Sequence, residues 1–281
     1  MDAGCGNGYM SKEFSKLVNN TGKVYTLDSE KEAIERLKEK TKGPMPLVML
    51  HGLFGGPENW ESTIPYLPKT CLPVVMLFRF FDEDRNLSSL SALTDYAQQY
   101  LDELAYDPMV LMGNSLGGHI AILLTLRMPE RVQGLILSGS SGLFERSFTR
   151  VPGTKPPRHW VHAKTCEVFY NQSHVTDTLV DTVMGVISDR SKVRILLRLA
   201  KSAKRHNIRS KLRLIHCPTL LIWGRQDKIT PPVVADSFHK SIPNSSLAWI
   251  DECGHAPMIE RPLEFASHLG SWWLEKLRPS V

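Results

Sequence analysis

The sequence predicts an α/β fold with a mostly parallel β-sheet and helices on both of its faces. Short apolar runs that suit buried strands alternate with longer segments of helical periodicity from residue 46 onward. Several runs end in glycine-rich turns, as PLVMLHGLFGG does at residues 46–56, which is typical of a buried parallel strand that leads into a loop. The 281 residues are enough for one such domain with an inserted segment.

Six apolar runs are expected to form the strands of the sheet. They are PLVML (46–50), PVVMLF (73–78), MVLMG (109–113), GLILSGS (134–140), TLLIWG (219–224) and SSLAWID (245–251). Residues 90–105 place leucine or alanine at three- and four-residue steps, which predicts an amphipathic helix with Leu90, Leu93, Ala97, Leu101 and Leu104 on its apolar face. A mostly buried helix is expected over 115–132, and a closing helix over 261–277.

The pattern between residues 142 and 213 interrupts the sheet, because it is helical and basic. It contains fifteen Lys or Arg and five Asp or Glu, a net charge of +10, whereas the whole chain carries +5. Within it, Val193, Leu196, Leu197 and Ala200 are expected to share one helix face. A basic segment can bind nucleic acid or an anionic surface, but it is more often a solvated helical face, so we expect no nucleic-acid partner.

The composition excludes several classes of protein. With 42% hydrophobic and 22% charged residues, and no apolar run near the roughly 18 residues that a membrane span needs, the chain reads as neither transmembrane nor disordered. No basic segment followed by an apolar stretch opens the sequence, so a cytoplasmic location is expected. Five scattered cysteines without a CxxC pair suggest neither a disulfide framework nor a zinc site.

The segment Gly113-Asn114-Ser115-Leu116-Gly117 fits the pattern G-x-S-x-G at the point where a predicted strand turns into a helix. Glycines two positions either side allow a turn so sharp that the serine takes a strained, exposed backbone conformation. The pentapeptide alone fits an ordinary strand–helix turn with an N-cap serine about equally well, so the other residues decide. We expect Ser115 to be a nucleophile.

A serine nucleophile needs a base and an acid, which follow it in the order Asp then His in this class of fold. Asp227 follows the strand TLLIWG and His255 follows the strand SSLAWID, so both are expected at the carboxyl ends of strands, where active sites gather. The rivals of Asp227 are Asp251 and Glu145. The sequence therefore predicts a triad of Ser115, Asp227 and His255.

Two backbone amides are expected to bind the oxyanion that develops in acyl transfer. Leu116, directly after the nucleophile, supplies one, and Leu53 in the HGLFG loop is expected to supply the other. His51 and Gly52 are expected to shape that loop rather than to react, and His119 is interpreted as a packing residue.

From about residue 46 to residue 277 the chain resembles an α/β-hydrolase with a helical cap, on the motifs HGLFGG, GNSLGG, GRQDKITP and CGHAPMIERP in family order. The resemblance implies a core of residues 44–141 and 214–281, a cap of residues 142–213, and a serine hydrolase that needs neither metal nor cofactor. It implies a small-molecule ester as substrate. One departure is the sequence RFFDEDRNLSS, where the family usually has D-x-x-G-x-G-x-S, so the loop beside the pocket is atypical.

Two alternatives stay open. Carbon–carbon bond hydrolases share the GNS-x-GG pattern, and the basic cap would suit the carboxylate of a vinylogous diketone acid, but those enzymes typically carry a tryptophan after the catalytic histidine, where this chain has Ala256. The other alternative is a non-catalytic binding protein that holds an anionic partner on the same scaffold. The complete set of Ser115, Asp227 and His255 argues against it.

Residues 1–43 differ from the rest of the chain. The loop Asp2-Ala3-Gly4-Cys5-Gly6-Asn7-Gly8, with Asp28 after the next strand, resembles the nucleotide-binding start of S-adenosylmethionine methyltransferases. The strand before Asp2 and all later strands are missing, so a vestigial or fused fragment is favoured over a working cofactor site. We further hypothesise that VYTLD (24–28) docks on the sheet as an edge strand.

Overall fold

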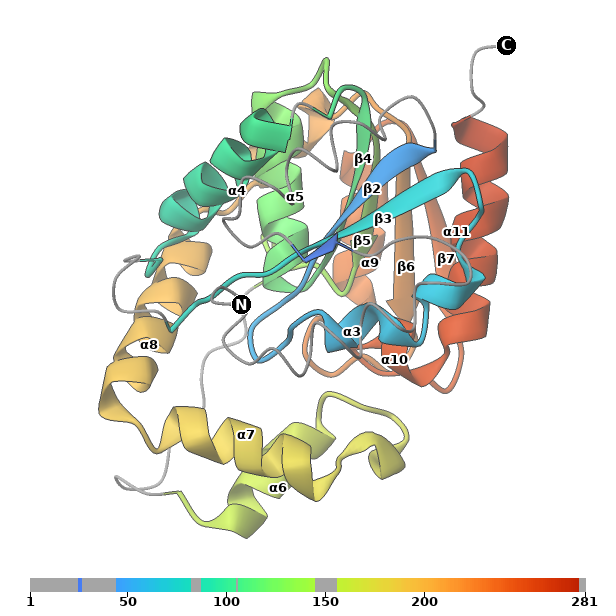
Figure 1. The fold of residues 1–281 in the computed structure, drawn as a ribbon. Helices are drawn as coiled ribbons and strands as arrows, with labels where there is room; N and C mark the ends of the chain where they lie inside the picture. Colours follow the sequence, from blue (N-terminus) through green and yellow to red (C-terminus); the bar gives the residue numbers. More distant parts are fainter. Residues whose placement is uncertain (1–24, 27–43, 82–86, 105, 145–155, 278–281) are drawn as a thin grey trace.

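The computed structural model describes residues 25–26, 44–81, 87–104, 106–144 and 156–277 (Figure 1). Seven strands form one sheet in the order β1-β3-β2-β4-β5-β6-β7, and every pairing among them is parallel. The strands are β1 (Tyr25–Thr26), β2 (Met45–Leu50), β3 (Cys71–Met76), β4 (Met109–Asn114), β5 (Val132–Ser138), β6 (Thr219–Gly224) and β7 (Ser245–Ile250). The predicted α/β fold is confirmed.

Helices cover both faces of this sheet, because alternate residues of each buried strand point to opposite sides. On one face lie α4 (Leu90–Leu104), α5 (Leu116–Arg127) and α9 (Pro232–Ser241), whose buried residues belong to the same cluster as Val48, Leu111 and Leu135 of the sheet. On the other lie α3 (Glu58–Glu61), the 3-10 turn η1 (Ile64–Tyr66), α10 (Pro257–Glu260) and α11 (Pro262–Lys276). Trp60, Phe265 and Trp273 fill that second layer.

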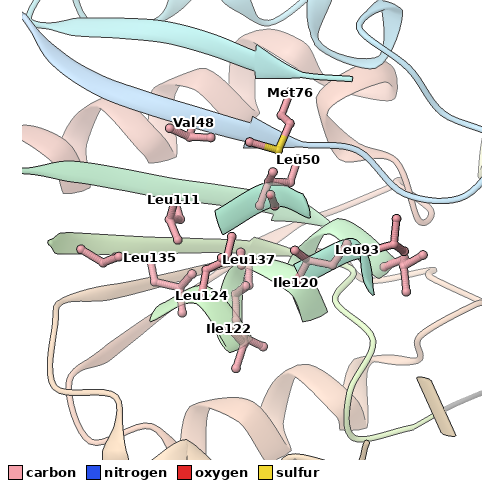
Figure 2. Close-up of a cluster of buried hydrophobic side chains, with 14 of the residues drawn as sticks. Val48, Leu50, Met76, Leu93, Leu111, Ile120, Ile122, Leu124, Leu135 and Leu137 are labelled. Carbon is pink, nitrogen blue, oxygen red and sulfur yellow. The ribbon is translucent and has the colours of Figure 1, made fainter. Parts of the chain in front are cut away.

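The first layer holds the helix that follows Ser115. Figure 2 shows Ile120, Ile122 and Leu124 of α5 in one buried cluster with Leu93 of α4 and with strand residues such as Leu135 and Leu137. All five residues predicted for the apolar face of α4 are fully buried, which confirms that helix. Since α5 is buried on almost every side, its first turn is held firmly against the end of β4.

The inserted segment between β5 and β6 is helical, as the sequence predicts. Its described part contains α6 (Arg158–Cys166), η3 (Gln172–His174), α7 (Asp177–Ile187), α8 (Arg190–Arg205) and η4 (Arg209–Leu214). In Figure 1, α6 and α7 lie beyond the loops at the carboxyl ends of the strands. No described helix is long and apolar enough to cross a membrane.

One face assignment in this segment is wrong. Leu197 was expected on the apolar side of its helix, but its side chain is 54% exposed. The buried residues of α8 are instead Leu196, Leu199 and Ala203, which share a face at three- and four-residue steps. Three consecutive apolar residues (Ile195, Leu196 and Leu197), with Leu199 two positions further on, allow two faces, and packing against the rest of the protein selects one.

The hypothesis of an edge strand within VYTLD agrees with β1, since Tyr25 and Thr26 pair in register with Val74 and Val75 of β3. The remaining calls on the N-terminal segment, namely the loop from Asp2 to Gly8 and the acid Asp28, lie outside the described residues.

We predict that Gly117→Ala destabilises the fold, because a Cβ at that position would meet the Leu50 carbonyl oxygen at 2.1 Å. Overpacking against backbone that cannot move aside costs about 3 kcal/mol. The matched control is Gly185→Ala in α7, where an added Cβ meets nothing within 4 Å and helix propensity favours alanine by up to about 1 kcal/mol. Urea unfolding of both variants measures the difference, and equal stabilities would contradict the packing argument.

Candidate active site

Ser115 stands between β4 and α5 in a backbone conformation that residues with a side chain seldom adopt, with φ +54° and ψ −120°. Backbone hydrogen bonds hold it there: its N–H donates to the Ser138 carbonyl (3.1 Å), and its carbonyl accepts from the N–H groups of His119 (3.2 Å) and Ser141 (3.1 Å). The strained turn that the G-x-S-x-G pattern predicts is therefore present.

The two glycines of the pattern are required by close contact. A Cβ at Gly113 would lie 2.4 Å from the backbone of Gly117, and a Cβ at Gly117 would strike the end of β2. The strand can turn into the helix within one residue only because neither glycine carries a side chain.

Asp227 and His255 come together at the carboxyl ends of β6 and β7. The Asp227 Oδ2 atom lies 2.8 Å from His255 Nδ1, and both side chains are buried. The other contacts of the carboxylate are to N–H groups of Ile229 (2.8 Å) and Thr230 (2.9 Å), on Oδ1, and to the Thr230 hydroxyl (2.8 Å), on Oδ2. A carboxylate that only accepts hydrogen bonds requires the proton of His255 on Nδ1, which leaves Nε2 as the acceptor.

The loop that carries His255 is hydrogen-bonded to Asn114, the residue before Ser115. Asn114 Nδ2 donates both to the Ser138 carbonyl (3.0 Å) and to the His255 carbonyl (3.1 Å). On the other side, the His255 N–H donates to the carbonyl of Val168 in the inserted segment (2.7 Å). The position of the imidazole thus depends on both β4 and the inserted segment.

Glu260 reinforces this connection. Its Oε1 accepts the N–H of Gly254 (2.7 Å), and its Oε2 accepts the N–H groups of Tyr170 (2.8 Å) and Asn171 (3.0 Å). One carboxylate therefore joins the histidine loop to the loop between α6 and η3. Such charge-assisted hydrogen bonds are stronger than those between neutral groups.

The HGLFG loop lies directly against Ser115. A Cβ at Gly52 would come within 2.9 Å of the Ser115 Cβ, and Phe54 takes a positive φ of 59°. Within the described residues, neither the Leu53 N–H nor the Leu116 N–H donates a recorded hydrogen bond to another protein group. Both predicted oxyanion donors thus belong to segments that adjoin Ser115, and Leu116 opens α5, where the helix dipole favours negative charge.

The rival residues lie in other settings. Asp251 pairs with Arg225 at the surface (2.7 Å), where its side chain is 78% exposed, and Glu145 lies outside the described residues.

His51 Nε2 accepts the Phe78 N–H (3.0 Å), while its Nδ1 lies 2.9 Å from the Gly52 carbonyl, so the ring holds the loop as expected. His119 Nε2 contacts the His206 carbonyl (3.0 Å), which fits a packing role.

Burial keeps several titratable groups near the site neutral. It lowers the pKa of His51 and of His119 to about 4, so both rings are uncharged at neutral pH. It also raises the pKa of the Cys253 thiol far above the usual range, with a further contribution from the Glu260 carboxylate, so this thiol is not a nucleophile at neutral pH.

Three residues of the site were missed from the sequence. Thr230 holds Asp227, Asn114 holds the histidine loop, and Glu260 holds that loop to the inserted segment. Their positions within QDKIT, GNSLG and CGHAPMIE give a local signal only for Asn114 and Thr230, which adjoin catalytic candidates. Two partners of Glu260, Tyr170 and Asn171, are about 90 residues away in the chain, so the sequence gave no sign of these contacts.

A cavity lies apart from this site, and the described residues offer no metal site. A cavity of about 460 Å³ is lined by residues such as Met45, Thr70 and Pro108, at the amino ends of the strands, the opposite end of the sheet from Ser115. In the described part of the chain, no group of three or more His, Cys, Asp or Glu side chains is placed to hold a metal ion.

Residues 47–268 match the family model described as "Alpha/beta hydrolase family". The chain belongs to this family. The match spans most of the chain and includes the elbow, both acid and histidine loops and the inserted segment. It confirms the fold that the resemblance of the four ordered motifs implied.

Relatives include esterases and carbon–carbon bond hydrolases. The chain is 30% identical to the pimeloyl-[acyl-carrier protein] methyl ester esterase of Nitrosomonas europaea, over 82% of this chain and 96% of that protein. It is 28% identical to the 2-hydroxymuconate semialdehyde hydrolase of a Pseudomonas species, over 82% and 87%. Among solved structures, MGS-MChE2, an alpha/beta hydrolase from the metagenome of sediments of the Mar Chica lagoon in Morocco, is 36% identical, with a TM-score of 0.69 and coverage of 84% and 93%.

These likenesses establish a hydrolase of the kind that includes esterases, lipases and carbon–carbon bond hydrolases. They give no support to the methyltransferase resemblance of residues 1–43, since the family match begins at residue 47 and none of these relatives is a methyltransferase.

The buried histidines predict a loss of stability in mild acid. Unfolded histidine takes up a proton near pH 6.5, whereas His51 and His119 resist protonation until about pH 4, so the unfolded state binds more protons between these values and stability falls as pH falls. At pH 5 each ring contributes a loss of about 2 kcal/mol relative to pH 7.

Urea unfolding at pH 7 and pH 5 measures this effect. We expect His119→Gln to reduce the pH dependence by about 2 kcal/mol, because glutamine keeps a donor for the His206 carbonyl and does not titrate. The exposed His216→Gln is the control. An unchanged pH dependence in His119→Gln would contradict the proposed cause.

Proposed function

We propose that this chain is a serine hydrolase that cleaves carboxylic esters through an acyl-enzyme intermediate. Ser115 Oγ attacks the ester carbonyl while His255 Nε2 takes the hydroxyl proton. The tetrahedral intermediate then collapses, and the proton passes from His255 to the departing alcohol. Water, deprotonated by the same nitrogen, attacks the acyl-Ser115 ester and releases the carboxylic acid.

The contact of 2.8 Å between Asp227 and His255 is the observation that carries this proposal. Because Asp227 receives the Nδ1–H, the lone pair of Nε2 is free to accept the proton of serine, and the carboxylate stabilises the imidazolium that forms. The three further hydrogen bonds to Asp227 fix its orientation in a buried place.

Two features support charge stabilisation in the transition state. The amides of Leu53 and Leu116 adjoin the nucleophile from two segments, and loss of one such donor typically costs about 10²- to 10³-fold in rate. Among the described residues, Phe54, Ser115 and Glu252 are the non-glycine residues with positive φ, and they lie in three of the four loops that form the site, as expected where function holds backbone strain.

Residues 142–213 are proposed to act as the cap that encloses a small-molecule substrate. The contact of Val168 with His255 and those of Tyr170 and Asn171 with Glu260 support this, since they join the inserted segment to the loop that carries His255. An ester is favoured by the esterase among the relatives and by Ala256, where carbon–carbon bond hydrolases typically carry tryptophan. The enzyme is proposed to act in the cytoplasm without metal or cofactor.

A second candidate is hydrolysis of a carbon–carbon bond in a vinylogous diketone acid. The likeness to 2-hydroxymuconate semialdehyde hydrolase favours it. Incubation of the protein with a panel of ring-cleavage dienoates, monitored by the loss of their visible absorbance, separates the two candidate activities. If esters are hydrolysed and dienoates are not, the result supports the first candidate. If dienoates are hydrolysed and esters are not, it supports the second.

Hydrolysis of p-nitrophenyl esters of increasing acyl length tests the main proposal. Ser115→Ala is expected to abolish turnover, and Asp227→Asn to lower kcat by about 10⁴-fold, because an amide cannot fix the tautomer of His255. The matched control is Asp251→Asn, which removes a surface ion pair with Arg225 and is expected to keep kcat within about twofold.

Equal activity of the Asp227 and Asp251 variants would contradict the assignment of Asp227. If no ester, thioester or dienoate shows turnover that depends on Ser115, the enzyme proposal fails. The non-catalytic binding role would then be the remaining reading of the fold.

A further inference from the structure

The outward face of α8 is a concentrated basic surface. At about 100° per residue, the exposed positions of the helix fall within an arc of roughly 120°, opposite the buried Leu196, Leu199 and Ala203. This basic face consists of Arg190, Arg194, Leu197, Arg198, Lys201, Lys204 and Arg205. It carries six cations and no acid, and η4 beside it adds the exposed Arg209, Lys211 and Arg213.

These cations differ from the other surface arginines of the protein. Elsewhere, arginine commonly pairs with a carboxylate of its own chain, as Arg127 does with Asp95, Arg225 with Asp251 and Arg261 with Glu252. On the basic face, none of the six cations forms an ion pair with a described residue. The acid at the start of the helix, Asp189, is occupied as its N-cap, bonded to Ser191 and the Lys192 N–H.

We propose that the basic face of α8 binds the surface of an anionic phospholipid bilayer. Uncompensated positive charge along a rigid 16-residue helix is complementary to a flat array of lipid phosphates and carboxylates. The binding is peripheral, because the apolar side of α8 is already packed on the protein core.

Two exposed leucines select lipid over other anions. Leu197 lies in the middle of the basic face with 54% of its surface exposed, and Leu214 at the end of η4 is 52% exposed. Aliphatic side chains among cations can enter the interfacial region of a bilayer. No Phe, Tyr or Trp occurs from residue 190 to residue 216, so the face lacks the aromatic platforms on which single-stranded nucleic acid stacks.

The distribution of charge supports one orientation. Residues 142–213 carry a net +10 while the whole chain carries +5, so the rest of the molecule is net negative. An anionic membrane attracts the first part and repels the second, and this attraction weakens with salt. The same inserted segment contacts the histidine loop through Val168 and, by way of Glu260, through Tyr170 and Asn171.

Sedimentation with vesicles tests the proposal on the full chain. We expect binding to vesicles of 70% phosphatidylcholine and 30% phosphatidylserine, none to pure phosphatidylcholine, and release at high salt. The double variant Arg198→Glu with Lys201→Glu is expected to lower the partition coefficient onto these vesicles by about thirtyfold or more, because each removed positive charge lowers it by about fivefold. The matched control is Lys69→Glu with Lys240→Glu, which changes net charge equally on exposed lysines elsewhere and is expected to bind nearly as the native protein does.

Leu197→Ser separates lipid from other polyanions. It is expected to weaken vesicle binding severalfold and to leave binding to heparin unchanged, since only a bilayer takes up the leucine. Failure to bind anionic vesicles at low salt would overturn the proposal, as would an equal loss in the Lys69 and Lys240 control or tighter binding of a single-stranded oligonucleotide than of the vesicles. Circular dichroism verifies that each variant is folded, and none of these readouts depends on the ester chemistry.

Discussion

The backbone of Ser115 is the constraint on which the rest of the site depends. A residue with φ +54° can persist only where its surroundings leave no alternative, and here strand β5, helix α5 and the turn after β5 all form hydrogen bonds with it. The missing side chains of Gly113 and Gly117 allow β4, β2 and the start of α5 to approach within contact distance. The buried core around α5 then supplies the stability that offsets the local strain.

The histidine loop shows that the inserted segment is part of the site rather than an appendage. His255 receives one fixed partner from the core, Asp227, and one from the insertion, the carbonyl of Val168. Glu260 bonds to both sides of the same junction. A shift of the insertion relative to the sheet would therefore move the imidazole, which links the position of the proposed cap to the proposed chemistry.

The fold and the sharp turn at Ser115 were predictable because they rest on local patterns. Strand periodicity, the apolar steps of α4 and the G-x-S-x-G turn each appear within a few residues, and the structure agrees with them. The second set of contacts was not predictable, since Glu260 acts on loops about 90 residues away. The face of α8 was misassigned at Leu197 because a run of apolar residues allows two faces, and only tertiary packing chooses between them.

The most direct test of the account is covalent labelling of the native protein with a fluorophosphonate, followed by peptide mass spectrometry. A serine activated by His255 is expected to form one phosphonyl adduct per chain, on Ser115, and the adduct is expected to vanish in His255→Ala. Absence of any adduct under conditions that label a known serine hydrolase, or stable modification of a different residue, would contradict the central claim that Ser115 is an activated nucleophile.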